Sequence, residues 1–313
     1  MGLGALYAVG PGLVRAEAAD LAEFLGESNG EKVSPFTFVQ MSDTHVGFQG
    51  PPNPLGTAAF EAAVARVNAL PQRPDLVLFT GDLVHDTEKP EEVRTRIQKF
   101  REIAARLKVP KLHFVPGEHD AGLDAGVVFR EVFGPTNYSF DHKGVHFIAL
   151  DNVSRARPEV GAEQIAWLKK DLARFAKSTP IIVFTHRPLF DLKPEWEWFT
   201  SDGDEVMNVL SPYTNVTVLY GHIHREHEEH TGSTRHLAAR SLAFAFPDPS
   251  TVPEKKPMPF DKEHPFKNLG VRQLVEAGGR RSQDPLQVNE VELALAEYSE
   301  INGQQQLLRA IAL

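Results

Sequence analysis

The sequence contains no cysteine. Without thiols, the chain cannot form disulfide bonds, a thiolate zinc site or a cysteine nucleophile. The compartment is left open, because a protein without disulfides is viable in oxidising and reducing surroundings alike. Long apolar runs are missing as well. No stretch of about 20 apolar residues occurs, and the sequence therefore predicts no membrane-spanning helix.

Basic residues are fewer than acidic ones: 33 Lys and Arg stand against 42 Asp and Glu, which gives a formal net charge of −9. No basic stripe is present, and this argues against a broad nucleic-acid-binding surface. A nuclease is disfavoured by the same balance, although a nuclease for short substrates stays open as an alternative. The 313 residues, with 42% hydrophobic content, are enough for one large α/β domain or two smaller ones.

The first 19 residues are small and mostly apolar, and Ala16-Glu17-Ala18 precedes Ala19. This resembles the hydrophobic region and cleavage site of a secretory signal, although no basic region precedes it. We therefore expect residues 1–19 to be the remnant of an export signal whose start lies upstream, and the protein to be periplasmic or otherwise exported. The alternative is a short hydrophobic N-terminus on a cytoplasmic protein.

Five short apolar segments have the β-branched and aromatic composition of buried strands. They are Phe36–Met41, Leu76–Phe79, Leu112–Val115, Ile181–Phe184 and Val216–Tyr220. Each is followed within a few residues by Asp, Glu or His. In open α/β sheets, ligands bind beyond the carboxyl ends of the strands, so we expect these side chains to meet at one edge.

The remaining segments give weaker signals. Helical spacing predicts four helices, at Thr57–Leu70, Glu91–Leu107, Val127–Phe133 and Glu163–Phe175. Asn137–Leu150 is predicted to form a hairpin, and Leu237–Phe246 a closing strand. The loop after His186 carries Phe190, Trp196, Trp198 and Phe199, which either pack the loop against the body or form a lid. The polar run Arg225–His230 is expected to be a solvated strand end, with extra metal ligands as the alternative.

The polar blocks at the strand ends resemble, in order, the pattern of the calcineurin-like metallophosphoesterase superfamily. They are Asp43/His45, Gly81-Asp82, Gly117-Glu118-His119-Asp120, His186 and Gly221-His222-Ile223-His224. The resemblance covers roughly residues 34–246 and looks closest to the cyclic-nucleotide phosphodiesterase-like branch. It implies an α/β/β/α sandwich, with two central mixed sheets flanked by helices. The domain is expected over residues 20–270, with residues 271–313 as a C-terminal extension packed on it.

The resemblance also implies two metal ions. The first would be held by Asp43, His45, Asp82 and His224, and the second by Asp82, Glu118, His186 and His222, with Asp82 as the bridge. Carboxylate and imidazole donors favour Mn²⁺ and Fe²⁺ or Fe³⁺, with Zn²⁺ possible. A hydroxide between the ions would then attack the phosphorus of a small phosphate mono- or diester.

Two further residues have catalytic roles by resemblance. His119 does not bind metal in the family but approaches the phosphate, where it stabilises charge or protonates the leaving oxygen. Its sequence neighbour Asp120 is expected to hold the tautomer of His119 and raise its basicity. Arg187, beside His186, is a candidate partner for a non-bridging phosphate oxygen, and His85, Asp86 and Asn152 are candidate neighbours of the pocket.

One residue departs from the family pattern: Glu118 stands where the family usually has a metal-binding Asn. The protein ligands then carry three negative charges instead of two, which weakens Lewis acidity or favours a trivalent ion. One hypothesis is that Glu118 binds the second metal and shifts metal preference. The other is that only one ion is held tightly. A fold-retaining metal-binding protein with little or no hydrolase activity is therefore the alternative function, and the oligomeric state is left open.

Overall fold

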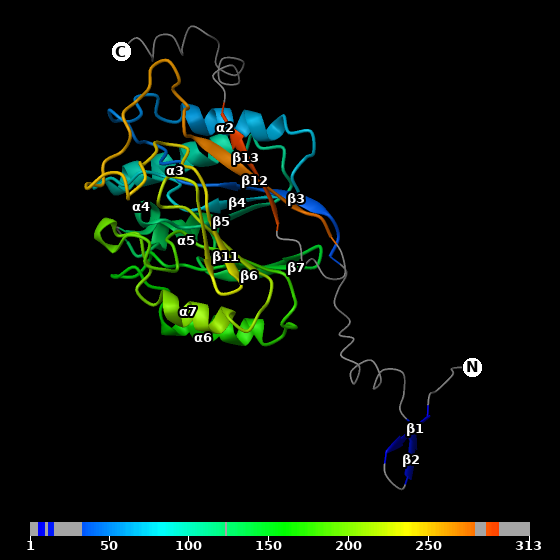
Figure 1. Ribbon diagram of the computed structural model, residues 1–313. Coiled ribbons are helices and arrows are strands. Elements are labelled where there is room, and N and C mark those ends of the chain that lie inside the picture. Colours follow the sequence, from blue (N-terminus) through cyan, green and yellow to red (C-terminus); the bar gives the residue numbers. More distant parts are fainter. Residues whose placement is uncertain (1–5, 10–11, 16–32, 123, 279–285, 294–313) are drawn as a thin grey trace.

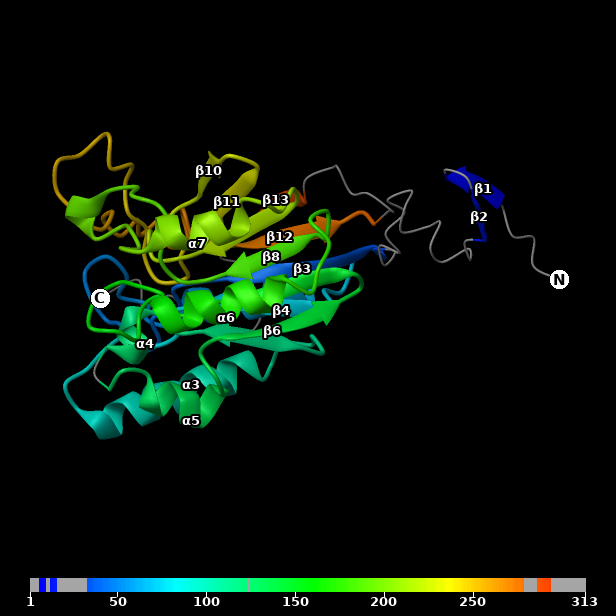
Figure 2. The same ribbon diagram turned by 90° about the horizontal axis from the view of Figure 1, so that it is seen from below.

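The computed structural model describes residues 6–9, 12–15, 33–122, 124–278 and 286–293. Two β-sheets form the centre of the molecule, and helices lie on the outer side of each (Figures 1 and 2). This confirms the predicted α/β/β/α sandwich.

The first sheet has five strands in the order β13–β12–β3–β4–β5. Strands β3, β4 and β5 are parallel to one another, and β12 is antiparallel to both β3 and β13. The sheet therefore includes residues on both sides of the boundary that the sequence suggested near residue 270. The bounds are β3 Phe36–Met41, β4 Leu76–Thr80, β5 Leu112–Val115, β12 Gly270–Glu276 and β13 Gln287–Glu292.

The second sheet has six strands in the order β10–β11–β9–β8–β7–β6. Four of them, β7, β8, β9 and β11, run parallel, and the antiparallel strands β6 and β10 close its two edges. The bounds are β6 Tyr138–His142, β7 Val145–Ala149, β8 Ile181–Phe184, β9 Val216–Tyr220, β10 His227–Thr231 and β11 Thr234–Ala238.

Helices cover the two outer faces (Figure 1). Helices α2, α3 and α5 pack on the first sheet, and α6 and α7 pack on the second. Two short elements, α4 and the 3₁₀ turn η1, lie in loops that follow β5 and β8. The bounds are α2 Ala58–Asn68, α3 Pro90–Ala104, α4 Glu118–Ala121, α5 Val127–Phe133, α6 Ala162–Leu172, η1 Pro194–Trp196 and α7 Gly203–Leu210.

The side chains of β3 point alternately to its two faces and pack in two different layers of the core. Phe38 points between the sheets, where its ring lies 5.6 Å from that of Phe147 on β7. Val39 and Met41 point the other way and pack under α2 and α3. Successive side chains of a strand face opposite sides, so an apolar strand such as β3 is buried on both faces.

Part of residues 1–19 forms a hairpin of β1, Leu6–Val9, and β2, Gly12–Arg15. The rest of that stretch lies outside the described residues, and the export signal stays a prediction. No helix in the described part of the chain is long and apolar enough to cross a membrane.

The predicted closing strand Leu237–Phe246 is wrong beyond its second residue, because β11 ends at Ala238. The chain then crosses the end of β3 instead of continuing beside β9. Ser241 Oγ donates a hydrogen bond to Asp43 O at 3.0 Å, and the Leu242 N–H donates to Ser42 O at 3.1 Å. Hydrogen bonds to the residues after β3 thus replace the strand ladder.

Two other ambiguous segments are resolved. Trp196 and Trp198 are buried against Tyr220 and Ile223, so these aromatics pack the loop after His186 onto the sheet. The polar run after His224 leads into β10, whose side chains are mostly exposed. Within the described chain, none of the residue groups that could hold a metal ion includes a β10 residue.

Candidate metal centre

The predicted site residues gather at the carboxyl ends of five parallel strands. In the first sheet, Asp43 and His45 follow β3, Asp82 follows β4, and Glu118, His119 and Asp120 follow β5; in the second, His186 follows β8, and His222 and His224 follow β9. The two edges are joined beneath the site by Gln40, whose Nε2 donates to Tyr220 O at 2.9 Å across the sheets.

The backbone at these strand ends is unusual. Five of the seven predicted metal ligands have positive φ angles, at Asp43 (53°), His45 (39°), Asp82 (51°), His222 (65°) and His224 (52°). A non-glycine residue in this left-handed region costs on the order of 1–3 kcal/mol, and such residues cluster at functional sites. All five residues belong to the two groups whose ligand atoms lie within 4.8 Å of one another.

Two glycines permit the close approach of the carboxylates. A Cβ at Gly117 would lie 2.0 Å from Asp82 Oδ1, and a Cβ at Gly221 would lie 2.7 Å from Asp43 Oδ2. Both distances are far below van der Waals contact. Only glycine lets the backbone pass this close to the two carboxylates.

A first group of possible ligands consists of Asp43, His45, Asp82 and His224, whose ligand atoms all lie within 4.8 Å of one another. His45 Nε2 is 3.4 Å from Asp82 Oδ2 and 3.1 Å from His224 Nε2, and His224 Nε2 is 3.3 Å from Asp43 Oδ1. All four residues are buried. This is the set that the sequence predicted for the first metal.

A second group shares Asp82 and adds Glu118, His186 and His222. His186 Nε2 lies 3.3 Å from Asp82 Oδ2 and 2.9 Å from Glu118 Oε2. His222 Nδ1 lies 2.8 Å from Glu118 Oε1. Glu118 therefore lies with the residues predicted to share its metal ion, and Asp82 Oδ2 lies close to histidines of both groups.

The outward-facing nitrogens of three of these histidines are anchored on backbone carbonyls. His186 Nδ1 donates to Thr80 O and His224 Nδ1 to Phe244 O, each at 2.7 Å, and His222 Nε2 donates to Glu197 O at 3.0 Å. A proton held on the outer nitrogen leaves the inner nitrogen with a lone pair. Metal-binding histidines are oriented in this way.

One inward-facing atom, Asp43 Oδ2, is buried without a hydrogen-bond partner among the described residues. Burial of unpaired polar atoms is costly unless another group satisfies them. The donors are oxygen and nitrogen throughout, a set that suits Mn²⁺, iron or Zn²⁺. The residues therefore fit metal ions at both groups.

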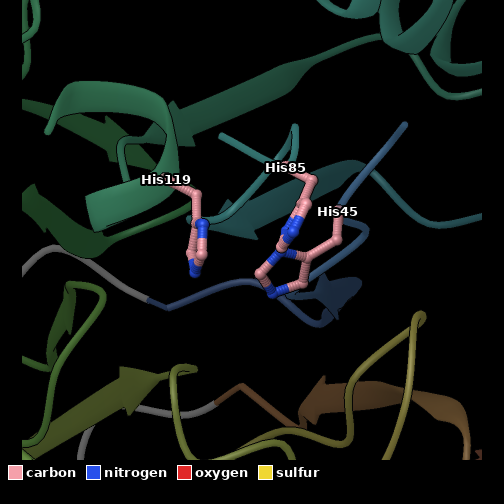
Figure 3. A group of neighbouring side chains, drawn as sticks. All are labelled: His45, His85 and His119. Atoms are coloured by element: carbon pink, nitrogen blue, oxygen red, sulfur yellow. The ribbon is translucent and has the colours of Figure 1, made fainter. Parts of the chain in front are cut away.

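His119 belongs to neither group that shares Asp82. Its Nδ1 lies 2.6 Å from Asp86 Oδ1 and its Nε2 lies 4.0 Å from Asp82 Oδ2. Burial favours the neutral ring, but the nearby carboxylates of Asp82 and Asp86 outweigh it and raise the pKa of His119 to about 9. Figure 3 shows His119 with the rings of His85 and His45, which form a third cluster beside the site.

Asp120 does not contact His119 as predicted. Its carboxylate accepts backbone N–H groups from Leu83 at 3.0 Å, Val84 at 2.9 Å and Gly117 at 2.8 Å. The two residues are neighbours in α4, and successive side chains of a helix point about 100° apart. Sequence reasoning placed Asp86 near the pocket but did not pair it with His119, because that contact joins two separate loops.

Two of the suggested neighbours hold other site residues. His85 Nδ1 lies 3.2 Å from His45 Nδ1. The outward-facing nitrogen of His45 is therefore hydrogen-bonded to an imidazole, whereas those of the other three histidines are hydrogen-bonded to carbonyl oxygens. The side chain of Asn152 makes two hydrogen bonds to the backbone of Arg187. Nδ2 donates to Arg187 O at 3.0 Å, and Oδ1 accepts from Arg187 N at 3.2 Å.

The family model for calcineurin-like phosphoesterases matches residues 36–226, a range that contains all seven predicted metal ligands and His119. The chain belongs to the calcineurin-like phosphoesterase family. Metal-dependent hydrolysis of phosphate esters is accordingly its class of activity.

Named relatives agree with this family. The phosphoesterase is 24% identical to a 3′,5′-cyclic-nucleotide phosphodiesterase of Nostoc sp., over 70% of this chain and 82% of the relative. It is 28% identical to a probable glycerophosphodiester phosphodiesterase of Arcobacter nitrofigilis, over 60% and 71% of the two chains. A dimetal phosphatase from Danio rerio has the same fold, with a TM-score of 0.56 and 13% identity over 83% of this chain and 99% of that one.

Proposed function

We propose that this phosphoesterase holds two metal ions, one in each ligand group, and hydrolyses small phosphate diesters. The position of Asp82 carries the proposal: its Oδ2 lies 3.4 Å from His45 Nε2 in one group and 3.3 Å from His186 Nε2 in the other. Two ions would polarise the phosphoryl oxygens and lower the pKa of bound water to about 7. A shared carboxylate reduces the repulsion between two neighbouring cations.

His119 is the group that we assign to the leaving oxygen. Asp86 anchors its Nδ1, and neither ligand group that contains Asp82 requires its Nε2. Its side chain is 27% exposed, so a substrate entering from solvent can reach the ring. From this position the imidazole can hold a proton next to the reacting phosphate, as general acids do.

The preference for diesters is supported by the names of the Nostoc and Arcobacter relatives. The restriction to small substrates is supported by the net charge of −9, which disfavours binding a polyanion. The oxygen and nitrogen donors, with three carboxylates among them, support Mn²⁺ together with Fe²⁺ or Fe³⁺ as the ions.

We also propose that the protein is exported. The support is the apolar sequence of residues 1–19, with its Ala16-Glu17-Ala18 motif. Separation of periplasm from cytoplasm in cells expressing the natural gene, including any upstream start, tests this. Protein found only in the cytoplasm would contradict it.

The test of function compares hydrolysis of bis(4-nitrophenyl) phosphate with hydrolysis of 4-nitrophenyl phosphate, each with Mn²⁺ and with chelator. The variant is His119→Ala, and the matched control is His230→Ala, an exposed histidine of β10 outside the ligand groups. We expect Mn²⁺-dependent turnover that favours the diester. The rate should fall roughly 10²–10⁴-fold in His119→Ala and stay unchanged in the control.

Other outcomes separate the alternatives. Preference for the monoester would keep the two-ion site and overturn the diester assignment. No turnover of either ester, by protein that carries two ions per chain, would favour the metal-binding protein without hydrolase activity.

A further inference from the structure

Arg187 is a buried arginine directly beside the second ligand group. Its side chain is only 10% exposed, and its Nη2 lies 3.4 Å from Glu118 Oε1. Its Nη1 donates to Glu197 O at 2.8 Å, the same carbonyl that anchors His222. Its backbone is fixed on both sides by Asn152. The guanidinium is thus held in place by the protein itself.

The positive charge of Arg187 offsets the negative charge of Glu118. Counting only Asp82, Glu118 and Arg187, the two ionised carboxylates of the second group give −2, and Arg187 brings this sum to −1. The Lys255 ammonium also interacts with Glu118 and adds the same charge whichever residue stands at position 118. An Asn at position 118, without a neighbouring cation, would also give −1. The carboxylate at this position and the arginine beside it are therefore electrostatically equivalent to the amide that the family pattern usually has.

We propose that Arg187 is a positioning residue whose charge offsets that of Glu118, so that the second group keeps the affinity for divalent ions that an amide ligand would give it. This inference rests on the proposed two-ion function. It offers an answer to the third carboxylate, because the local sum stays at −1 when Glu replaces Asn and Arg187 accompanies the glutamate.

The contacts of the guanidinium favour this role over direct binding of the substrate phosphate. Nη1 is engaged by Glu197 O and Nη2 faces Glu118. Nε is buried and has no hydrogen-bond partner among the described residues, so it is not open to solvent. An arginine free to bind phosphate bidentately would present a pair of these N–H groups outward.

The experiment is a double-mutant cycle read by metal binding. Glu118→Asn, Arg187→Gln and the double variant are stripped of metal, and Mn²⁺ binding is measured by equilibrium dialysis and calorimetry. Arg187→Lys keeps the charge at the position. Arg235→Gln is the matched control, because Arg235 also pairs with a glutamate, Glu228 at 2.7 Å, on strands away from the site.

Charge alone predicts the order of affinities at the second site. Glu118→Asn leaves a local sum of 0 and should weaken Mn²⁺ binding roughly 10–100-fold. Arg187→Gln leaves −2, so Mn²⁺ should bind at least as tightly as in the wild type. The double variant restores −1 and should return to within about threefold of the wild type. Arg187→Lys and Arg235→Gln should bind Mn²⁺ as the wild type does.

A double variant that binds Mn²⁺ as weakly as Glu118→Asn would overturn the inference. Thermal melting of each metal-free variant shows whether it is folded, and Arg187→Met replaces the Gln variant if that one is not. A wild-type protein that binds fewer than two Mn²⁺ ions per chain would contradict the proposed two-ion function. This result is distinct from the result that would overturn the role of Arg187.

Discussion

Asp86 Oδ1 lies 2.6 Å from His119 Nδ1, whereas Asp120, the sequence neighbour of His119, is turned away from it. The two aspartates therefore have different roles. Asp86 orients an imidazole from the opposite loop, and Asp120 ties the turn after β5 to the turn after β4 through three backbone N–H groups. Substitutions at the two positions should have different consequences.

Replacing Asp86 should impair turnover without unfolding the protein. Asp86→Asn keeps the shape of the side chain but removes the charge that orients His119. We expect kcat to fall roughly 10–100-fold, as for other partners of functional histidines, with two Mn²⁺ ions still bound. Steady-state kinetics and metal analysis measure both quantities. Asp248→Asn, which alters a partly exposed pair with Arg225, is the control and should keep the kcat of the wild type.

Replacing Asp120 should mainly destabilise the fold. In Asp120→Asn, one carboxylate oxygen becomes an NH₂ group, which then faces a backbone donor instead of accepting from it. We expect the free energy of unfolding to fall by about 1–3 kcal/mol, measured by urea denaturation of metal-free protein. An unchanged midpoint with a reduced kcat would instead return Asp120 to the catalytic role first predicted for it.

A methyl group at Gly117 should displace Asp82 and disrupt both ligand groups together. The Cβ of Gly117→Ala would lie 2.0 Å from Asp82 Oδ1 and 2.3 Å from Asp82 N, so the loop must move. We expect at least a roughly tenfold loss of Mn²⁺ affinity at each site, measured by calorimetry.

The control for this substitution is Gly232→Ala in the turn between β10 and β11. Gly232 also has a positive φ, 61°, but nothing lies within 4 Å of its added Cβ. Its variant should lose about 1 kcal/mol of stability and keep its metal affinity. Equal metal binding by both variants would show that Asp82 tolerates the displacement.

The stability of the metal-free protein should decline as the pH falls from 6.5 to 4. His236 on β11 is fully buried, with neither ring nitrogen bonded to a described residue, and burial lowers its pKa from 6.5 to about 4. Burial likewise lowers the pKa of His113 to about 4. In this interval the unfolded chain takes up protons that the folded protein excludes, so unfolding becomes easier as the pH falls.

Urea denaturation at pH 7.5 and pH 5 checks this expectation. His236→Leu removes one of the two groups, so its loss of stability between these two pH values should be smaller than that of the wild type. An equal loss would show that His236 is not responsible. His230→Ala, which alters an exposed histidine, should leave the pH dependence unchanged.

The strands that carry the site could be predicted from sequence because their signal is local. Runs such as Phe36–Met41 are buried on both faces, and burial on both faces requires continuous apolar composition. The segment Leu237–Phe246 was mispredicted for the converse reason. Its small and apolar residues resemble a strand, but after Ala238 its hydrogen bonds go to the end of β3, which is distant in sequence.

The sequence predicted which residues form the site better than it predicted which of their side chains contact one another. The family resemblance predicted the members of both ligand groups, and the structure brings these residues together because each block follows its own strand. Side-chain directions beyond the strand ends depend on left-handed residues such as Asp82 and His222, which no spacing rule indicates. The pairings of His119 with Asp86 and of Glu118 with Arg187 join separate loops and needed the structure.

The place of β12 between β13 and β3 has a consequence for how the protein is made. Every proposed metal ligand precedes residue 225, yet β3, which leads to Asp43, has one of its two neighbours from residues 270–276. During synthesis, the ribosome therefore releases all seven ligands before the sheet beneath them can close. Until then β3 has an unpaired, apolar edge, and the nascent chain is exposed to mispairing at the strand where the metal centre begins.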